Sequence, residues 1–166
     1  LRVSGPLAAP VLEGLAGTKF SVAAHPRKLR LAHLFDSRGR QLDQAMVAYF
    51  EAGASFTGEP VVELHLHGGP VVQASVMEEL LRQGCRQALP GEFSFRAVRN
   101  GKLTLDQAQG VRDLIESSSR SAQLLAMERL SGHQAKAFEA QAEVLRQALT
   151  LAEAGIDFSD QEIDEL

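Results

Sequence analysis

The stretch VVELHLHGGP, from Val61 to Pro70, constrains the fold more than any other part of the sequence. Ionisable and apolar residues alternate along it, which predicts a β-strand with one apolar and one polar face. The apolar residues at 62, 64 and 66 are expected to face the core, with Glu63, His65 and His67 together on the opposite face. Gly-Gly-Pro follows at once, and proline in this place is typical of the first turn of a helix. The chain therefore contains a strand–turn–helix unit.

Three interpretations of the polar strand face are compatible with the residues alone. A carboxylate and two imidazoles form a plausible ligand set for zinc. The solvated face of an ordinary strand carries the same residue types. A ligand cradle is the third interpretation, because backbone approaches a ligand closely at glycine and a helix start presents free N–H groups. Glu63 would then accept charge-assisted hydrogen bonds from an amino-substituted ring.

The composition is that of an ordinary globular protein with a modest negative charge. Of 166 residues, 45% are hydrophobic and 23% charged. The net charge of −4 argues against a chain that binds nucleic acid mainly through its phosphates. Cys85 is the single cysteine, so an internal disulfide is excluded and a reducing, cytoplasmic setting is expected. No run approaches the roughly 18 apolar residues of a membrane span.

Turn signals and hydrophobic periodicity divide the first part of the chain into helices and strands. The predicted elements are helix 6–16, strands 29–33 and 45–50, strand 61–67, and helix 70–84. Residues 88–103 show no clear period and carry the turn signals Pro90-Gly91 and Asn100-Gly101, so they are expected to be irregular. This part of the chain predicts an α+β domain.

The second part of the chain has helical periodicity almost throughout. Thr104 and Gln107 match a capping box, and apolar residues follow at helical spacing to Ile115. The pattern continues over 121–154 with one break at Ser131-Gly132. We predict two domains, 1–117 and 118–166. The long apolar stripe has few other segments in this sequence against which it could be buried. Because the chain also starts and stops abruptly, we expect a fragment of a longer protein.

Five blocks of the sequence, in order, resemble one known family. They are RVSGP, SFTGEPVVELHLHGGP, PGEFSFRAVRNGKLTLDQAQGVRDLI, LSGH and EAGIDFSDQEID. The family's versions of the two long blocks read SFTGED-xx-ELH-x-HGGP and PGEFTxRAFLNGKLDLxQAEAVADLI. On these blocks the chain is identified as a member of the MnmE, or TrmE, family of tRNA modification GTPases.

The resemblance implies a fold, a reaction and a set of partners. It implies an N-terminal mixed sheet with helices, similar to the folate domain of the aminomethyltransferase, followed by an all-α extension. Family members bind 5-formyl-tetrahydrofolate and dimerise through this domain. With the FAD-containing MnmG they install an aminomethyl-type group at carbon 5 of the tRNA wobble uridine. GTP, Mg²⁺ and K⁺ act in a separate G domain, and no membrane is involved.

The family's folate site carries over to Arg2, Glu63 and Lys102. These residues match the arginine of the family's RxSG strand end, the glutamate of ELH and the lysine of NGK. Glu63 would accept hydrogen bonds from the pterin, and the two cations would meet the folate's carboxylates or ring oxygens. His67 and Arg96 are further candidates, each with a structural alternative: a satisfied histidine and a loop-bracing ion pair. No catalytic residue and no metal ligand is assigned.

Two features set this chain apart from intact family members. It contains no GxxxxGK[ST] run, so these 166 residues are not expected to bind or hydrolyse GTP. Pro60 and Thr104 replace two aspartates of the family blocks, which changes the charge around the expected site. A folate-dependent one-carbon transferase without a GTPase domain is therefore an alternative function. A zinc hydrolase built on Glu63, His65 and His67 is a second alternative.

Overall fold

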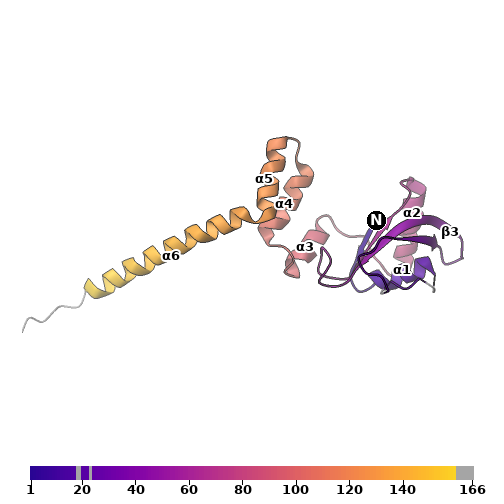
Figure 1. Cartoon of the computed structure of the whole chain (residues 1–166), viewed down its shortest axis with the longest axis horizontal. Coiled ribbons are helices and arrows are strands. Elements are labelled where there is room, and N and C mark those ends of the chain that lie inside the picture. Colours follow the sequence, from indigo (N-terminus) through magenta and orange to yellow (C-terminus); the bar gives the residue numbers. More distant parts are fainter. Residues whose placement is uncertain (18–19, 23, 160–166) are drawn as a thin grey trace, which may run out of the picture. The chain divides into compact units, whose positions relative to one another are not determined.

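A computed structural model describes residues 1–17, 20–22 and 24–159, and the chain divides into two compact units. Unit 1 covers Leu1–Thr104 and unit 2 begins at Leu105. Unit 1 contains, in order, β1 (Arg2–Ser4), α1 (Ala8–Ala16), β2 (Arg30–Phe35), β3 (Gln41–Phe50), β4 (Val61–His65), α2 (Pro70–Arg82) and α3 (Glu92–Arg99). Unit 2 contains α4 (Leu105–Glu116), α5 (Arg120–Ser131) and α6 (His133–Ser159) (Figure 1).

The sheet of unit 1 has four strands in the order β1-β4-β3-β2. All three pairings are antiparallel, which corrects the mixed sheet that was expected. In the register, Arg2 lies opposite Glu63, and Glu63 lies opposite Ala48. Short connections suffice for an antiparallel hairpin, and the β2–β3 turn closes with a hydrogen bond from the Gly39 amide to the Asp36 carbonyl.

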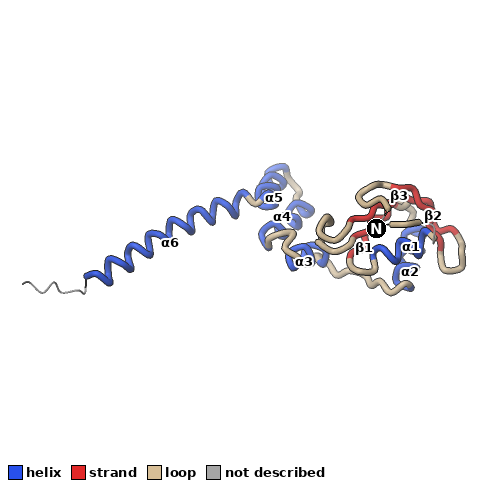
Figure 2. Tube along the Cα trace, turned by 60° about the horizontal axis from the view of Figure 1, so that its bottom comes forward, coloured by secondary structure: helices blue, strands red, loops and turns tan. Residues whose placement is uncertain are grey.

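The core lies on one face of this sheet, beneath α1 and α2 (Figure 2). Val62 and Leu64 of β4 are 0% and 2% exposed, and Leu66 packs against the same cluster. The apolar positions of the alternating stretch therefore face the core, as the period of two predicts. The opposite face of the sheet, which carries Arg2 and Glu63, is called the open face below.

The predicted elements of unit 1 are confirmed with shifted ends. The first helix begins at Ala8 rather than Pro6 and ends at Ala16, and the Gly17 that follows has a φ of 83°, a left-handed value that glycine adopts without strain. The alternating strand stops at His65, before the predicted end at 67. The α+β class is confirmed.

The segment expected to be irregular contains a helix. Residues 92–99 form α3, which follows Gly91 in the left-handed conformation and begins with Glu92. An acidic residue in the first turn favours a helix there, because its charge complements the helix dipole. The short length and mixed polarity of α3 explain why its period is hard to detect in the sequence.

In unit 2, α4 and α5 pack closely against each other. Gly110 is buried in α4, and a Cβ built there would lie 2.8 Å from the backbone nitrogen of Leu130 in α5. Arg129 of α5 pairs with Asp113 at 2.6 Å and with Asp106 at 3.4 Å. The predicted domain boundary at residue 117 follows α4, whereas the division of the structure precedes it. The functions expected for the domains 1–117 and 118–166 stay predictions.

The break predicted at Ser131-Gly132 is confirmed, because Gly132 ends α5 with a φ of 74°. The long helix α6 then exposes its apolar stripe: Phe138 is 61%, Leu145 70% and Leu149 59% exposed. The EAGIDFSDQEID block runs past residue 159 and lies partly outside the described residues. Among the helices that the structure describes, none has the length and hydropathy of a membrane span.

Replacing Gly110 by alanine is expected to destabilise unit 2. Alanine favours a helix interior over glycine by about 0.8–1 kcal/mol. The added methyl group meets backbone rather than a flexible side chain, and overpacking of that kind costs roughly 1–3 kcal/mol. The steric term wins, and urea unfolding followed by far-ultraviolet circular dichroism will show a lower midpoint. The neighbouring Gln109→Ala, at an exposed position, is the control and should leave the midpoint nearly unchanged. Equal or higher stability of Gly110→Ala would contradict the close α4–α5 contact.

Candidate functional site

The open face of the sheet brings Arg2 and Glu63 together. They are directly opposite each other on β1 and β4, and the Arg2 Nη2 and Nε groups donate to one Glu63 carboxylate oxygen, Oε1, at 2.7 and 3.0 Å. His65 Nε2 lies 3.6 Å from the other oxygen, Oε2. The Glu63 side chain is 24% exposed, so the pair is partly accessible to solvent. Two of the three predicted site residues are therefore in contact.

Two aromatic rings flank the guanidinium of Arg2. The centroids of Phe56 and Phe93 lie 6.0 and 5.7 Å from its central carbon. Phe56 belongs to the loop 51–60 between β3 and β4, and Phe93 belongs to α3. Guanidinium–ring contacts at this distance are favourable. The Arg2–Glu63 pair thus lies beside flat apolar surfaces from two other segments.

Lys102 contacts the same loop at a different place. Its Nζ donates to the carbonyl of Gly53 at 2.7 Å, and its side chain packs over Gly58, where an added Cβ would lie 3.1 Å from Lys102 Cγ. The loop 51–60 thus contacts Lys102 through Gly53 and Arg2 through Phe56. The structure places Lys102 against the loop that borders the pair, where it binds the backbone carbonyl of Gly53 rather than Glu63.

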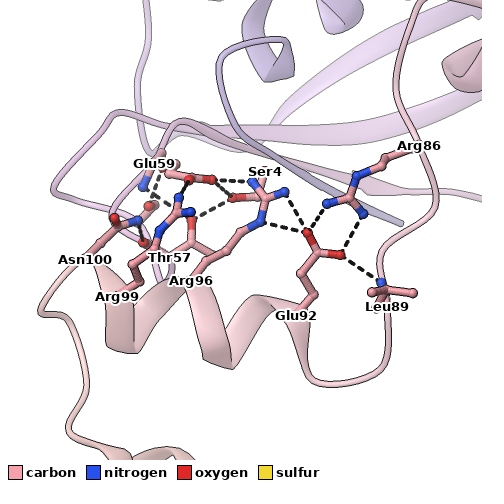
Figure 3. Close-up of polar contacts among 10 residues, drawn as sticks. Ser4, Thr57, Glu59, Arg86, Leu89, Glu92, Arg96, Arg99 and Asn100 are labelled. Atoms are coloured by element: carbon pink, nitrogen blue, oxygen red, sulfur yellow. Dashed lines mark hydrogen bonds and ion pairs between the residues drawn. The ribbon is translucent and has the colours of Figure 1, made fainter.

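Glu59 ties this loop to β1 and α3 (Figure 3). Its carboxylate accepts from Arg96 at 2.7 Å, from Ser4 at 3.1 Å and from Arg99 at 3.1 Å. Burial alone would raise the pKa of Glu59, but the hydrogen bonds from Arg96 and Ser4 outweigh it and hold the pKa below its ordinary value. The loop, the first strand and α3 therefore meet at one ionised carboxylate.

Thr57 reinforces the same junction without any charge. Its side chain is fully buried, and its hydroxyl lies 2.7 Å from the Ser4 hydroxyl. Asn100 donates its side-chain amide to the Thr57 carbonyl at 2.7 Å. Buried polar groups are stable only when hydrogen-bonded in this way. The SFTGE sequence thus encodes a loop that closes on β1 and on the end of α3.

Glu92 connects the segment before α3 to the helix itself through hydrogen bonds and ion pairs, an arrangement called the Glu92 clasp below (Figure 3). Arg86 forms an ion pair with its carboxylate, Arg96 donates to it at 2.7 Å, and the Leu89 amide donates at 2.8 Å. These hydrogen bonds, led by that from Arg86, hold the pKa of Glu92 far below its ordinary value. Arg96 bridges Glu92 and Glu59, so it has the loop-bracing ion pairs that were one of its two expected roles.

His67 does not share a site with Glu63 and His65. Because β4 ends at His65, the chain turns, and His67 bonds to Asp43 instead. The backbone N–H of His67 donates to Asp43 Oδ2 at 2.9 Å, and its Nδ1 lies 2.7 Å from Oδ1. Burial opposes ionisation of Asp43, but the bonds from His67 outweigh it and lower the pKa. His67 thus has the structural partner that was its alternative role.

The zinc interpretation finds no support in this geometry. Within residues 1–17, 20–22 and 24–159, no group of three histidine, cysteine or acidic side chains is placed to hold a metal ion. The expectation that His67 shares the polar face assumed that the strand continues to residue 67, and that expectation was wrong. Cys85 is half-buried against the core, and burial raises the pKa of its thiol, which disfavours the reactive thiolate.

Several residues of the candidate site and its surroundings were not predicted from the sequence. Asp43 occupies a core-facing position of β3, two residues before the buried Ala45, and a carboxylate there signals a buried partner. Glu92 follows Pro-Gly at the start of a helix, which is a signal for a capping acid. Ser4, Thr57 and Glu59 carry no such signal, because their contacts join positions more than 50 residues apart or depend on the loop's conformation.

Together, fold and site define an α+β domain whose open sheet face carries an arginine–glutamate pair, followed by a helical unit. A family model described as the N-terminus of the GTP-binding protein TrmE matches residues 1–102. The chain belongs to that family.

Curated relatives match along nearly the whole chain. It is 44% identical over 99% of its length to the tRNA modification GTPase MnmE of Methylococcus capsulatus. The proteins of the same name from Phenylobacterium zucineum and Thiobacillus denitrificans are 42% and 43% identical over 98% and 99% of the chain. In each case the matched region is 36% of the relative's own length. The chain therefore spans about a third of the relatives it matches.

The Glu92 clasp is expected to make the stability of unit 1 depend on pH. A carboxyl group with a lowered pKa in the folded state stabilises the fold above its unfolded pKa, near 4.5, and this contribution is lost as the pH falls below that value. Glu92→Gln removes the contribution. The stability difference between wild type and Glu92→Gln should be largest near neutral pH and shrink as the pH falls below about 4.5.

Tyr49 is the single tyrosine and lies in β3, so its fluorescence during urea unfolding reports on unit 1. The exposed Glu78→Gln on α2 serves as the matched control, with a small difference at every pH. A wild-type to Glu92→Gln difference that stays constant from neutral to acidic pH would show that the clasp is not electrostatic.

Proposed function

We propose that this chain is the folate-binding and dimerising part of a tRNA modification GTPase. Membership of the TrmE N-terminal family and the names of the relatives support the proposal. In the intact protein, GTP, Mg²⁺ and K⁺ would be bound by a separate G domain. The partners would be tRNA and an MnmG-like FAD protein, and the reaction would place an aminomethyl-type group on carbon 5 of the wobble uridine. The setting would be the cytoplasm.

The ligand of the present domain is 5-formyl-tetrahydrofolate, held by Arg2, Glu63 and Lys102. The single observation that carries this assignment is the Arg2–Glu63 pair on the open face. The Glu63 side chain is 24% exposed, and its carboxylate would accept hydrogen bonds from the amino group and ring N–H of a pterin. The rings of Phe56 and Phe93 beside Arg2 provide apolar surface on which a flat ring can stack. The residues present therefore fit the ligand.

Lys102 would join the site by exchanging its present partner. Its bond to the Gly53 carbonyl is an exposed one, and an ammonium group forms a stronger, charge-assisted bond with a folate carboxylate. Arg96 lines the region beside Arg2 and would act chiefly by holding the loop. His67, bonded to Asp43, would shape the Gly68-Gly69 turn rather than touch the ligand directly.

The homodimer would form through unit 1. Leu29, just before β2, and Leu31 in β2 are 56% and 55% exposed, and Leu31 lies opposite Met46 on the open face. Exposed apolar groups next to an open sheet face favour association with a second copy. A one-carbon transferase without a GTPase domain is distinguished from this function by the coding sequence after Leu166. A GxxxxGK[ST] motif there supports the GTPase, and an uninterrupted transferase domain opposes it.

Glu63→Ala is expected to weaken binding of 5-formyl-tetrahydrofolate. Removing a carboxylate that accepts charge-assisted hydrogen bonds costs about 1.5–3 kcal/mol, which corresponds to at least about a tenfold loss of affinity. Isothermal titration calorimetry with the purified chain measures it. Lys102→Met should lower affinity as well, by removing the cation for the folate's carboxylates.

Glu78→Ala, which removes an exposed carboxylate of α2 away from the open face, is the matched control. Circular dichroism of each variant establishes that it is folded. Equal affinity of the wild type, Glu63→Ala and the control would remove Glu63 from the site. Absence of any binding by the wild-type chain would refute the folate assignment itself.

A further inference from the structure

Residues 25–30, which lead into β2, have the sequence HPRKLR and carry three cations and a histidine without any acid. Arg27 and Lys28 are exposed, and neither forms a salt bridge or a side-chain hydrogen bond with any residue that the structure describes. In this they differ from Arg86 and Arg96, which bind carboxylates. The charges of Arg27 and Lys28 are therefore available to an anion from another molecule. His25, Arg27, Lys28 and Arg30 are together called the basic surface below.

Arg30 and Lys28 lie beside two aromatic rings. The Arg30 guanidinium carbon is 4.1 Å from the centroid of the Phe20 ring, and Arg30 Nη1 donates to the Ser21 carbonyl at 2.7 Å. Phe20, Tyr49, Lys28 and Arg30 line one shallow hollow, and no carboxylate is among its described lining residues. The hollow has a volume of about 10 Å³, roughly that of one water, so it cannot enclose a small molecule. An anion would have to lie on this surface rather than inside it.

The acids on the adjoining elements do not pair with the basic surface. Glu13 of α1 accepts from the Val22 amide at 3.1 Å, and Glu51, which follows β3, forms no salt bridge with a described cation. Side chains alternate along a strand, so Arg30 faces the side of β2 opposite to Leu31 and to the open face. The basic surface is therefore a local patch of positive charge, separate from the proposed folate contact.

We propose that the basic surface binds the phosphate backbone of the tRNA substrate. The proposal rests on the proposed function, in which tRNA is the polyanion that this protein meets. Lysine and arginine side chains are the usual contacts to nucleic-acid phosphates, and an unpaired base stacks on aromatic or guanidinium planes such as those of Phe20 and Arg30. Because Phe20 and Tyr49 are half-buried, they suit a base at the surface better than insertion into a lipid bilayer.

The surface positions the RNA and does not hold it alone. A few cations contact only a few phosphates, and the net charge of −4 opposes a larger electrostatic contact. Arg27 is suited to such positioning because its backbone is fixed: its amide donates to the Tyr49 carbonyl at 2.7 Å. With a φ of 60°, Arg27 is also the one described non-glycine residue in the left-handed conformation, which persists only where the surrounding structure holds it.

Fluorescence anisotropy with the purified chain and an unmodified tRNA transcript that has uridine at the wobble position tests the proposal. At about 50 mM salt, Arg27→Gln/Lys28→Gln should bind about tenfold or more weakly than the wild type, and its slope of log affinity against log salt should be smaller by about 1.4–1.8, because two phosphate contacts are lost. Arg38→Gln/Arg120→Gln removes the same charge at exposed positions outside the basic surface and should bind as the wild type does. Circular dichroism establishes that each variant is folded.

Equal affinity of the wild type and Arg27→Gln/Lys28→Gln would overturn the proposal, and an equal loss in the control would show that only net charge matters. Absence of tRNA binding by the wild type at about 100 μM, the weak end of non-specific affinities, would also overturn it. If that protein still binds 5-formyl-tetrahydrofolate, the proposed folate function stands; if it binds neither, both fail. Binding to phosphatidylglycerol vesicles that requires Arg27 and Lys28, without tRNA binding, would assign the surface to a membrane instead.

Discussion

The loop 51–60 is held against β1 and α3 by the carboxylate of Glu59, and the geometry of the open face depends on this contact. Arg96 reaches Glu59 at 2.7 Å while also binding Glu92, so one guanidinium connects the loop, the helix and the segment before it. The Arg96 and Glu59 side chains are only 23% and 18% exposed. Breaking a partly buried pair leaves a charge without its partner, which costs more than losing a surface salt bridge.

The candidate site follows from that junction. Phe56 comes from the loop, Phe93 from α3 and Arg2 from β1, and they meet only when the three segments are joined. Lys102 follows α3 and binds the loop at Gly53, so it too depends on the loop's position. A cavity of about 360 Å³ beside β1 is lined by the same network, because Arg86, Glu92 and Arg96 border it. The candidate site and the cavity next to it therefore depend on one network of ion pairs.

The sequence predicts the parts of this structure that local patterns control. The alternation at 61–66 identifies the core face of β4, and glycine and proline mark the ends of helices 8–16 and 70–82. The end of the strand at His65 was not predictable, because it depends on Asp43, a residue 24 positions away from His67. Glu63 opposite Arg2 is a register contact between distant strands, and it was reached through a family resemblance rather than through periodicity. The Glu59 junction needs tertiary structure, and no local pattern encodes it.

Amide hydrogen exchange of an Arg96→Met variant tests the junction most directly. If Arg96 holds the three segments together, residues 51–60 and 85–92 will both exchange faster than in the wild type, while α1 in the core will not change. Arg99→Met is the matched control, because Arg99 makes a single, more exposed contact with Glu59 at 3.1 Å, and it should change exchange little. Unchanged exchange of residues 51–60 in Arg96→Met would show that the loop is held by other means and would contradict the account.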